Sequence, residues 1–292
     1  MNPIETHSNG VSKSAPPFKP LRSIITCVAL TYTLSWAWLA YLISRGGYVA
    51  LDGIGPLVFM WMPGLCSLLC RHIFREGFRD IGWKWRNWKA TLAAIWVPFV
   101  VGLPVYLILW GTGLAPRSHN GHAPLHIFGL ILAIMVPVGS VFALGEELGW
   151  RGYLLDRLIK AGLRRPVFIL GLIWAVWHLP VILTGQYTKT DNMALTTIFF
   201  VLMVLGFNAA ICRLRLVSGS IWVPMLIHAV HNTVFQNILQ WATVENKWHT
   251  MLGGECGALT VLAYGLLAWL MWREPRRKTD GWNGMQQALE EK

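Results

Sequence analysis

Charged residues are scarce in this sequence, and acidic residues are the scarcest of them. Asp, Glu, Lys and Arg make up 13% of the 292 residues, with 14 acidic against 25 basic side chains. Hydrophobic residues reach 54%, 17 residues are Trp, and the mean hydropathy is +0.47. Soluble domains carry roughly 25% charged residues, so this composition excludes an ordinary soluble protein.

Several kinds of segment are also missing. Residues 1–23 are polar and lack the short apolar core of a signal peptide, so we expect a disordered cytoplasmic tail there. The alternating pattern of a membrane β-barrel does not occur. The five cysteines, an odd number, lie in or next to apolar segments and imply no disulfide framework.

The sequence does contain a series of apolar runs, each close to the roughly 20 residues that cross a bilayer as a helix. We therefore predict an all-α, polytopic membrane bundle of about eight helices. They form one transmembrane domain, residues 24–272, and residues 273–292 form a second cytoplasmic tail. The predicted spans are 24–43, 51–73, 90–109, 125–145, 166–183, 194–211, 220–241 and 257–272.

The placement of basic residues predicts the orientation of these spans. With the N-terminus in the cytoplasm and eight spans, all Lys and Arg fall in inward-facing segments except Arg45, Arg117, Lys189 and Lys247. Adding or dropping one span would scramble this asymmetry, so both termini are predicted to be cytoplasmic. Topology and anionic lipid headgroups account for the net charge of +11, and we expect no nucleic-acid partner.

Polar residues inside apolar spans are costly, and they are treated as functional candidates for that reason. Glu146 and Glu147 end the fourth predicted span, and Arg151 follows. Glu147 and Arg151 are four residues apart, so they share a helix face and can form an ordinary interfacial ion pair. Glu146 points about 100° away and needs a partner from another helix. It is therefore the better candidate for proton transfer.

Two further groups of polar residues lie inside later spans. His178 follows Trp174 by four residues in "WAVWHLP", and a lone histidine of this kind is often only a hydrogen-bonded packing residue. In "MLIHAVHN", His228 and Asn232 share a helix face and His231 lies beside them. Three polar groups in one turn of an apolar helix are hard to explain by packing alone.

Depth in the membrane links Glu146, His178 and His228. Glu146 ends an inward-running span. The two histidines lie roughly 18 and 13 Å along helices that enter from the cytoplasmic side, at 1.5 Å per residue. We expect all three to meet in the cytoplasmic half of the bundle, with the Asn232 amide. Such a convergence fits a hydrolytic site.

Two chemistries use these residue types, and the sequence leaves both open. Glu146 could act as general base on a water molecule, with His or Asn donors stabilising the oxyanion. Alternatively, Glu146, His178 and His228 could bind a divalent metal such as zinc that activates the water. The zinc-protease signature HExxH is absent, and no Ser or Cys stands in an obvious nucleophile context.

The order EExxxR, aromatic-xxx-His and HxxxN across successive membrane helices resembles the CPBP family. This family comprises the type II CAAX prenyl proteases and their bacterial relatives, the Abi group. Here the motifs read Glu146-Glu147-xxx-Arg151, Trp174-xxx-His178 and His228-xxx-Asn232, within residues 144–232. The family often has Phe where this chain has Trp174.

The resemblance implies a CPBP-like catalytic core, residues 125–242, in an intramembrane endopeptidase. Glu146 would activate water with help from His178, and His228 and Asn232 would hold the water, a metal or the oxyanion. Glu147, Arg151 and Trp174 would shape the site. His231 is not part of the motif. We expect it to be a packing residue or to support the residues of the site.

The hypothesis is thus a glutamate- or metal-dependent protease of the bacterial cytoplasmic membrane. It would cut a peptide or membrane-protein substrate near the cytoplasmic face. The main alternative is a non-catalytic scaffold or immunity protein that binds a partner through the same bundle. A proton-coupled transporter would use similar residues but predicts an inverted repeat, which the sequence does not show.

Overall fold

The computed structural model describes residues 20–51, 53–188, 190 and 192–273. Most of the two predicted tails, residues 1–19 and 274–292, lies outside this part of the chain. The predicted all-helical fold is confirmed. The helices are α1 (Pro20–Ser44), α2 (Ile54–Ile73), α3 (Trp88–Thr112), α4 (Leu125–Gly149), α5 (Leu155–Lys160), α6 (Pro166–Leu183), α7 (Met193–Ser218), α8 (Trp222–Asn232), α9 (Lys247–Leu252) and α10 (Ala258–Arg273).

Shorter elements complete the described chain. Two are 3-10 turns, η1 (Arg79–Ile81) and η2 (Asn120–His122). The other two are π-helical segments, in which the hydrogen bonds span five residues rather than four. The segment η3 (Trp150–Leu154) joins α4 to α5, and η4 (Thr233–Leu239) extends α8.

Six helical segments in the described chain are long and apolar enough to cross a membrane. They are α1, α2, α3, α6, α7 and the continuous helix from α4 through η3 to α5, Leu125–Lys160. The other two predicted spans correspond to α8 with η4 and to α10, which has only 16 residues. A multi-pass membrane protein follows, while the count of eight spans stays a prediction.

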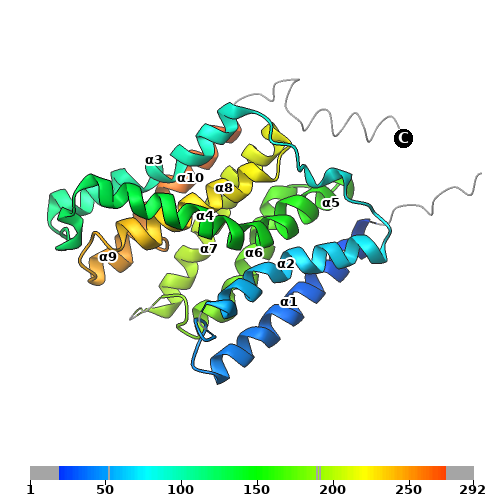
Figure 1. Cartoon of the computed structure of the whole chain (residues 1–292), viewed down its shortest axis with the longest axis horizontal. Coiled ribbons are helices and arrows are strands. Elements are labelled where there is room, and N and C mark those ends of the chain that lie inside the picture. Colours follow the sequence, from blue (N-terminus) through cyan, green and yellow to red (C-terminus); the bar gives the residue numbers. More distant parts are fainter. Residues whose placement is uncertain (1–19, 52, 189, 191, 274–292) are drawn as a thin grey trace, which may run out of the picture.

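The helices pack in a closed circuit that differs from their order in the sequence. Helix α2 lies between α1 and α4, α4 also packs on α8, and α8 packs on α3 (Figure 1). From α3 the circuit continues through α10, α7 and α6 back to α1, and α7 also touches α8 across it. The fourth, sixth and eighth helices are thereby brought around a common interior.

Glycines allow α2 and α4 to approach closely. A Cβ atom on Gly64 would lie 2.5 Å from the Gly145 carbonyl oxygen, and a Cβ on Gly149 would lie 2.5 Å from the Pro63 backbone. Small residues at such contacts are typical of membrane helices, because packing rather than water exclusion drives their association. This contact fixes the end of α4 that carries Glu146 and Glu147.

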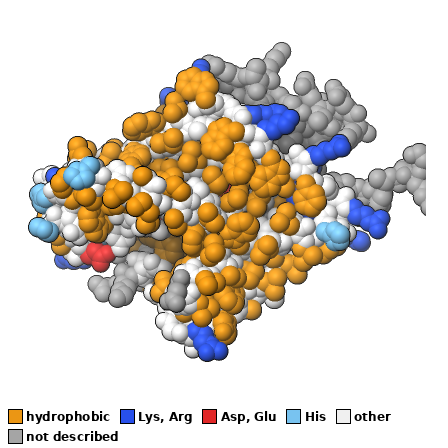
Figure 2. All heavy atoms as spheres, in the orientation of Figure 1, with side chains coloured by type: hydrophobic (Ala, Val, Ile, Leu, Met, Phe, Trp, Pro, Cys, Tyr) orange, Lys and Arg blue, Asp and Glu red, His pale blue; other side chains and the backbone are white. Residues whose placement is uncertain are grey.

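The outer surface of the bundle is apolar. Large hydrophobic side chains on α3 and α10 point away from the core, with Trp96 60%, Leu107 62% and Leu262 67% exposed. Figure 2 shows hydrophobic side chains over most of one face, with Lys and Arg toward its edges. A lipid environment accounts for this pattern, since few polar groups would face hydrocarbon.

Candidate active site

The helices enclose a cavity of about 740 Å³. Its lining brings together residues that are far apart in the sequence. It includes Glu146 from α4, Trp174 and His178 from α6, and His228, His231 and Asn232 from α8. The lining also reaches the loop between α6 and α7, residues 185–188, and the α9 region, residues 245–256. The convergence expected for Glu146, His178, His228 and Asn232 is therefore present.

The Glu146 carboxylate is buried and held by two indoles. Its Oε2 atom accepts hydrogen bonds from Trp174 Nε1 at 2.7 Å and from Trp150 Nε1 at 3.1 Å. We predicted that Glu146 would have a partner on another helix. That partner is Trp174, which belongs to α6. The Oε1 atom bonds to none of the described residues. One oxygen of Glu146 is thus fixed while the other remains available to a ligand.

Glu147 binds two side chains at once. Its Oε1 atom accepts hydrogen bonds from Arg151 Nη1 and from His228 Nδ1, both at 2.8 Å. The predicted Glu147–Arg151 pair is confirmed, and all three side chains are buried. His228, which the sequence suggested would face Glu146, is hydrogen-bonded to Glu147 instead. A carboxylate can only accept, so His228 Nδ1 carries the proton, and Nε2 hydrogen-bonds to none of the described residues.

Arg151 is held by α6 and α7 as well as by Glu147. Its Nη2 donates to Asn208 Oδ1 at 3.0 Å, and the guanidinium lies 4.2 Å from the centroid of the Trp174 ring. Asn208 in turn donates to the Val167 carbonyl at 2.7 Å. Asn208 was not predicted, although an Asn within the apolar run of α7 was a signal of the same kind as His178. These contacts make Arg151 a structural tie between three helices.

His178 is only partly buried and faces aromatic rings. Its Nδ1 donates to the Trp174 carbonyl at 2.9 Å, and its ring lies 5.2 Å from that of Phe200 and 6.2 Å from that of Tyr187. A carbonyl oxygen accepts and never donates, so Nε2 of the neutral ring is an unprotonated acceptor. His178 thus packs against aromatic rings and also presents a basic nitrogen, Nε2, that can accept a hydrogen bond.

Asn232 lines the cavity and is partly exposed. Its side-chain amide hydrogen-bonds to none of the residues that the structure describes. Helix α8 passes into the π-helical η4 at this point. The amide can therefore donate to a ligand without breaking a bond to the protein.

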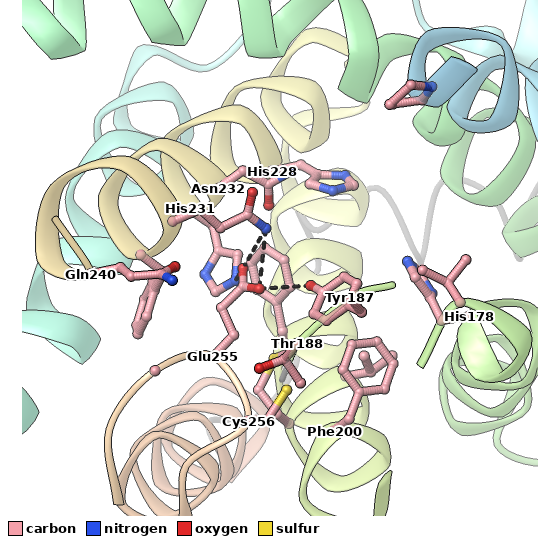
Figure 3. Close-up of a pocket in the computed structure, with 18 of the residues that line it drawn as sticks. His178, Tyr187, Thr188, Phe200, His228, His231, Asn232, Gln240, Glu255 and Cys256 are labelled. Atoms are coloured by element: carbon pink, nitrogen blue, oxygen red, sulfur yellow. Dashed lines mark hydrogen bonds and ion pairs between the residues drawn. The ribbon is translucent and has the colours of Figure 1, made fainter. Parts of the chain in front are cut away.

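The cavity also contains a buried carboxylate, Glu255, that sequence reasoning missed (Figure 3). Tyr187 donates to it at 2.6 Å, Gln236 at 3.1 Å, and His231 Nε2 lies 3.0 Å from Oε1. Figure 3 shows Glu255 between Tyr187 and His231, with His178 on the facing side. His231 Nδ1 also lies 2.7 Å from the Tyr264 hydroxyl, so the predicted supporting residue belongs to this cluster.

Glu255 lies in the loop between α9 and α10, where charge is common, so its sequence context gave no reason to select it. The only available signal was an acidic residue inside the glycine-rich "GGECG". Burial favours the neutral carboxyl. The hydrogen bonds from His231, Tyr187 and Gln236 outweigh it and hold the pKa of Glu255 below its ordinary value.

The geometry does not fit a three-ligand metal site. Among the described residues, no three His, Cys, Asp or Glu side chains form a group that could hold a metal ion. Glu146 is bound to two indoles, and His228 is hydrogen-bonded to Glu147 rather than placed beside Glu146.

The position of Glu146 along its helix differs from the sequence prediction. The fourth span was expected to end at residue 145, at the cytoplasmic side. Instead, the helix continues through η3 and α5 to Lys160, because its later charges are paired within the protein. At 1.5 Å per residue, Glu146 lies about 21 Å before the end of this continuous helix.

Comparisons with known proteins show what the region around Glu146, His178 and His228 resembles. Residues 123–234 match the family model "Type II CAAX prenyl endopeptidase Rce1-like". The chain is also 24% identical over 238 residues to CAAX prenyl protease 2 of Methanococcus maripaludis, which covers 75% of this chain and 84% of that relative. The matched region holds every predicted site residue from Glu146 to Asn232. Over this region the chain therefore resembles the Rce1-like type II CAAX prenyl endopeptidases, and the two matches together indicate a membrane protease.

Proposed function

We propose that this protein is an endopeptidase that cuts a peptide bond within the membrane, near its cytoplasmic face, with Glu146 as the general base. One observation carries the proposal. Glu146 is fixed through Oε2 by two indoles, while its Oε1 is free in a cavity that also presents unbonded nitrogens of His178 and His228. A positioned base with a free oxygen in a cavity is what activation of a water molecule requires.

The reaction then runs as a direct attack by water. Glu146, assisted by His178 Nε2, takes a proton from the water as its oxygen bonds to the carbonyl carbon of the substrate. The resulting tetrahedral oxyanion collapses, the C–N bond breaks, and the proton passes to the leaving amine nitrogen. A carboxylic acid and an amine are released, and the carboxylate of Glu146 is restored.

His228 and Asn232 are placed to stabilise the oxyanion. The Glu147 carboxylate holds His228 by Nδ1, at 2.8 Å, so its Nε2 is directed elsewhere and can donate when protonated. The Asn232 amide lines the same cavity and has no competing bond to the described residues. Donors that are aligned before the charge develops stabilise it at little reorganisation cost.

The substrate that we propose is an apolar segment or C-terminal end of a membrane protein, in a bacterial cytoplasmic membrane. Apolar side chains such as Phe59, Phe200 and Met203 line the cavity beside the polar residues. The name of the Methanococcus relative refers to CAAX prenyl substrates. We extend to this chain the peptide chemistry that such a name implies.

The test is cleavage of a quenched fluorescent CAAX peptide, with and without a farnesyl group, by purified protein in detergent. Glu146→Gln keeps the shape of the side chain but removes the base, so the rate should fall by about 10²–10⁴-fold. The matched control is Glu245→Gln, which removes another carboxylate of the same cavity, one that accepts a side-chain hydrogen bond only from Gln240 among the described residues. Full activity of Glu146→Gln would refute the assignment.

His178→Ala and His228→Ala should both fold and both lose activity, as judged by elution profile and thermal midpoint. If His178→Ala kept the wild-type rate, His178 would be a packing residue, as its aromatic neighbours would also allow. The roles of the two histidines are thus separable by experiment.

A further inference from the structure

A second cavity, of about 520 Å³, lies apart from the one that holds Glu146. It is formed by the segment between α2 and α3, residues 78–86, together with η3, α5 and the end of α7. The linings of the two cavities share no residue. The proposed proteolytic mechanism does not use this space.

Basic side chains dominate the lining of the second cavity. Five of them contribute to it: Arg79, Lys84, Arg86, Arg151 and Arg215. The side chains of Arg79, Lys84 and Arg86 are exposed and pair with none of the described residues. At Arg215, Nε and Nη2 donate to backbone carbonyls, whereas Nη1 has no such acceptor.

The lining also contains two carboxylates, Asp80 and Asp156. Both form ion pairs with basic residues outside the cavity lining. Asp156 pairs with Lys160 at 2.6 Å and with Arg157 at 2.7 Å. Asp80 pairs with Arg71 and Arg157. Burial would raise the pKa of Asp80, but these two arginines hold it well below its usual range. None of the three pairing cations lines the cavity, so a surplus of positive charge faces it.

Arg151 provides an independent indication of a ligand site. Arg151 is 1% exposed, and its buried Nε atom donates to none of the described residues. Buried donors in native proteins are nearly always satisfied, by protein, water or ligand. Arg151 is thus a deeply buried cation in the wall of a cavity already rich in unpaired cations.

Close backbone packing fixes the wall of this cavity. Gly82 has a φ of 83°, and a Cβ there would lie 2.4 Å from the Gly219 carbonyl oxygen and 3.0 Å from Arg215 Nη1. The Gly82 carbonyl accepts a hydrogen bond from the Ile221 amide at 2.9 Å. The segment 78–86 is therefore attached to the start of α8, and its basic side chains are presented by a defined loop.

Tryptophans beside the cavity indicate its depth in the membrane. Trp83 and Trp85 are 46% and 55% exposed, and both rings pack on Trp222, with centroids 5.6 and 6.1 Å away. Tryptophan is enriched at the level of the lipid headgroups. The segment 78–86 is also among those predicted to face the cytoplasm. Anionic phosphate groups of phospholipids lie at this level.

We propose that this cavity binds the phosphate of an anionic phospholipid headgroup, held by Arg79, Lys84, Arg86 and Arg215. The acyl chains would lie against the exposed apolar surface of the bundle. Free phosphate shares the same chemistry, but the interfacial tryptophans favour the lipid as its source. This site is independent of peptide-bond cleavage.

The test measures lipid binding by the full-length protein in a nonionic detergent, by native mass spectrometry and by the shift of the thermal midpoint. The probes are dioctanoyl phosphatidylglycerol, dioctanoyl phosphatidylcholine and inorganic phosphate. The variant is Lys84→Ala with Arg86→Ala. The matched control is Arg22→Ala with Arg164→Ala, since both are exposed cations of the predicted cytoplasmic face outside the cavity.

Phosphatidylglycerol should bind the wild type and the control with equal affinity, with one lipid molecule in the second cavity of each protein. In Lys84→Ala/Arg86→Ala, its half-saturating concentration should rise about 30-fold, which corresponds to about 1 kcal/mol for each basic side chain. Equal affinity in the variant would overturn the proposal. So would equal binding of phosphatidylcholine, or binding of inorganic phosphate as tight as that of phosphatidylglycerol.

Discussion

At the scale of single residues, the two adjacent carboxylates are held by different kinds of donor. Glu147 is bound by the Arg151 guanidinium and by His228, whereas Glu146 is bound by the neutral indoles of Trp150 and Trp174. Removal of the Glu147 carboxylate would leave the buried Arg151 without its counter-ion, which is costly. Glu146 forms no ion pair with the described residues. This difference supports the proposed division into a structural Glu147 and a catalytic Glu146.

Local spacing predicted part of this arrangement. The i,i+4 rule predicted the Glu147–Arg151 pair, because both residues belong to one helical segment. The bonds from Trp174 to Glu146 and from His228 to Glu147 join different helices, and their geometry depends on how α6 and α8 pack on α4. Spacing within one helix says nothing about such contacts. The hydrogen bond from His228 to Glu147 was therefore not predicted, although the convergence of His228 with Glu146 in one cavity was.

Glu255 supports a residue-scale prediction. Its side chain is 9% exposed and holds together Tyr187, His231 and Gln236, which belong to three segments. Glu255→Gln should lower the free energy of unfolding by about 1–2 kcal/mol at neutral pH, because charged hydrogen bonds are replaced by weaker ones. Thermal or denaturant unfolding in detergent measures this loss.

The same prediction has a definite pH dependence. Because the pKa of Glu255 is lowered in the folded protein, its contribution is present above the unfolded value of about 4.3 and is lost as the pH falls through the folded value. The deficit of Glu255→Gln should therefore shrink below about pH 4. Glu245→Gln serves as control, and an equal loss of stability in both variants would contradict the role of Glu255.

At the scale of helices, the apolar runs predicted the elements but not their irregularities. All eight predicted spans contain a helix, since about 20 apolar residues in lipid have no alternative fold. The π-helical segment η3 begins after Gly149 and contains Arg151 of the first motif, and η4 begins after Asn232, the last residue of the third motif. No apolar pattern marks a π-helix. Such segments depend on tertiary contacts and often occur at functional sites.

The α2–α4 contact supports a prediction at this scale. A Cβ on Gly145 would lie 2.7 Å from the Trp61 Cα, so Gly145→Ala forces the two backbones apart next to Glu146. Overpacking of this kind costs about 1–3 kcal/mol, and the proteolytic rate should fall as well. The measurements are the thermal midpoint and the cleavage rate in detergent.

Gly129→Ala is the matched control, on the same helix with no heavy atom within 4 Å of the added Cβ. Alanine is favoured over glycine in a helix by about 1 kcal/mol, so this variant should be as stable as the wild type or more so. If Gly145→Ala behaved like Gly129→Ala, close helix contact would not fix the position of Glu146.

At the scale of the whole molecule, the closed circuit of helices could not be read from the sequence, because it depends on long-range packing. The predicted topology nevertheless agrees with the contacts between loops. Two loops predicted to lie outside meet where Ser118 donates through its backbone amide to the Ala242 carbonyl, at 2.9 Å. On the predicted inner side, the loop residue Gly82 accepts a hydrogen bond from the Ile221 amide, at the cytoplasmic start of the predicted span 220–241. Each of these contacts joins segments assigned to the same side.

This agreement leads to a topology prediction for the intact protein. The five native cysteines are buried and free, so single cysteines introduced in loops can be labelled with a membrane-impermeant maleimide against a low background. Arg117→Cys and Lys247→Cys should react in intact cells, whereas Lys84→Cys and Arg164→Cys should react only after permeabilisation. The positive-inside rule assigns positions 84 and 164 to the cytoplasmic side and positions 117 and 247 to the outer side. The Ser118–Ala242 contact requires positions 117 and 247 to behave alike, so labelling of one but not the other in intact cells would rule out eight spans with both termini in the cytoplasm.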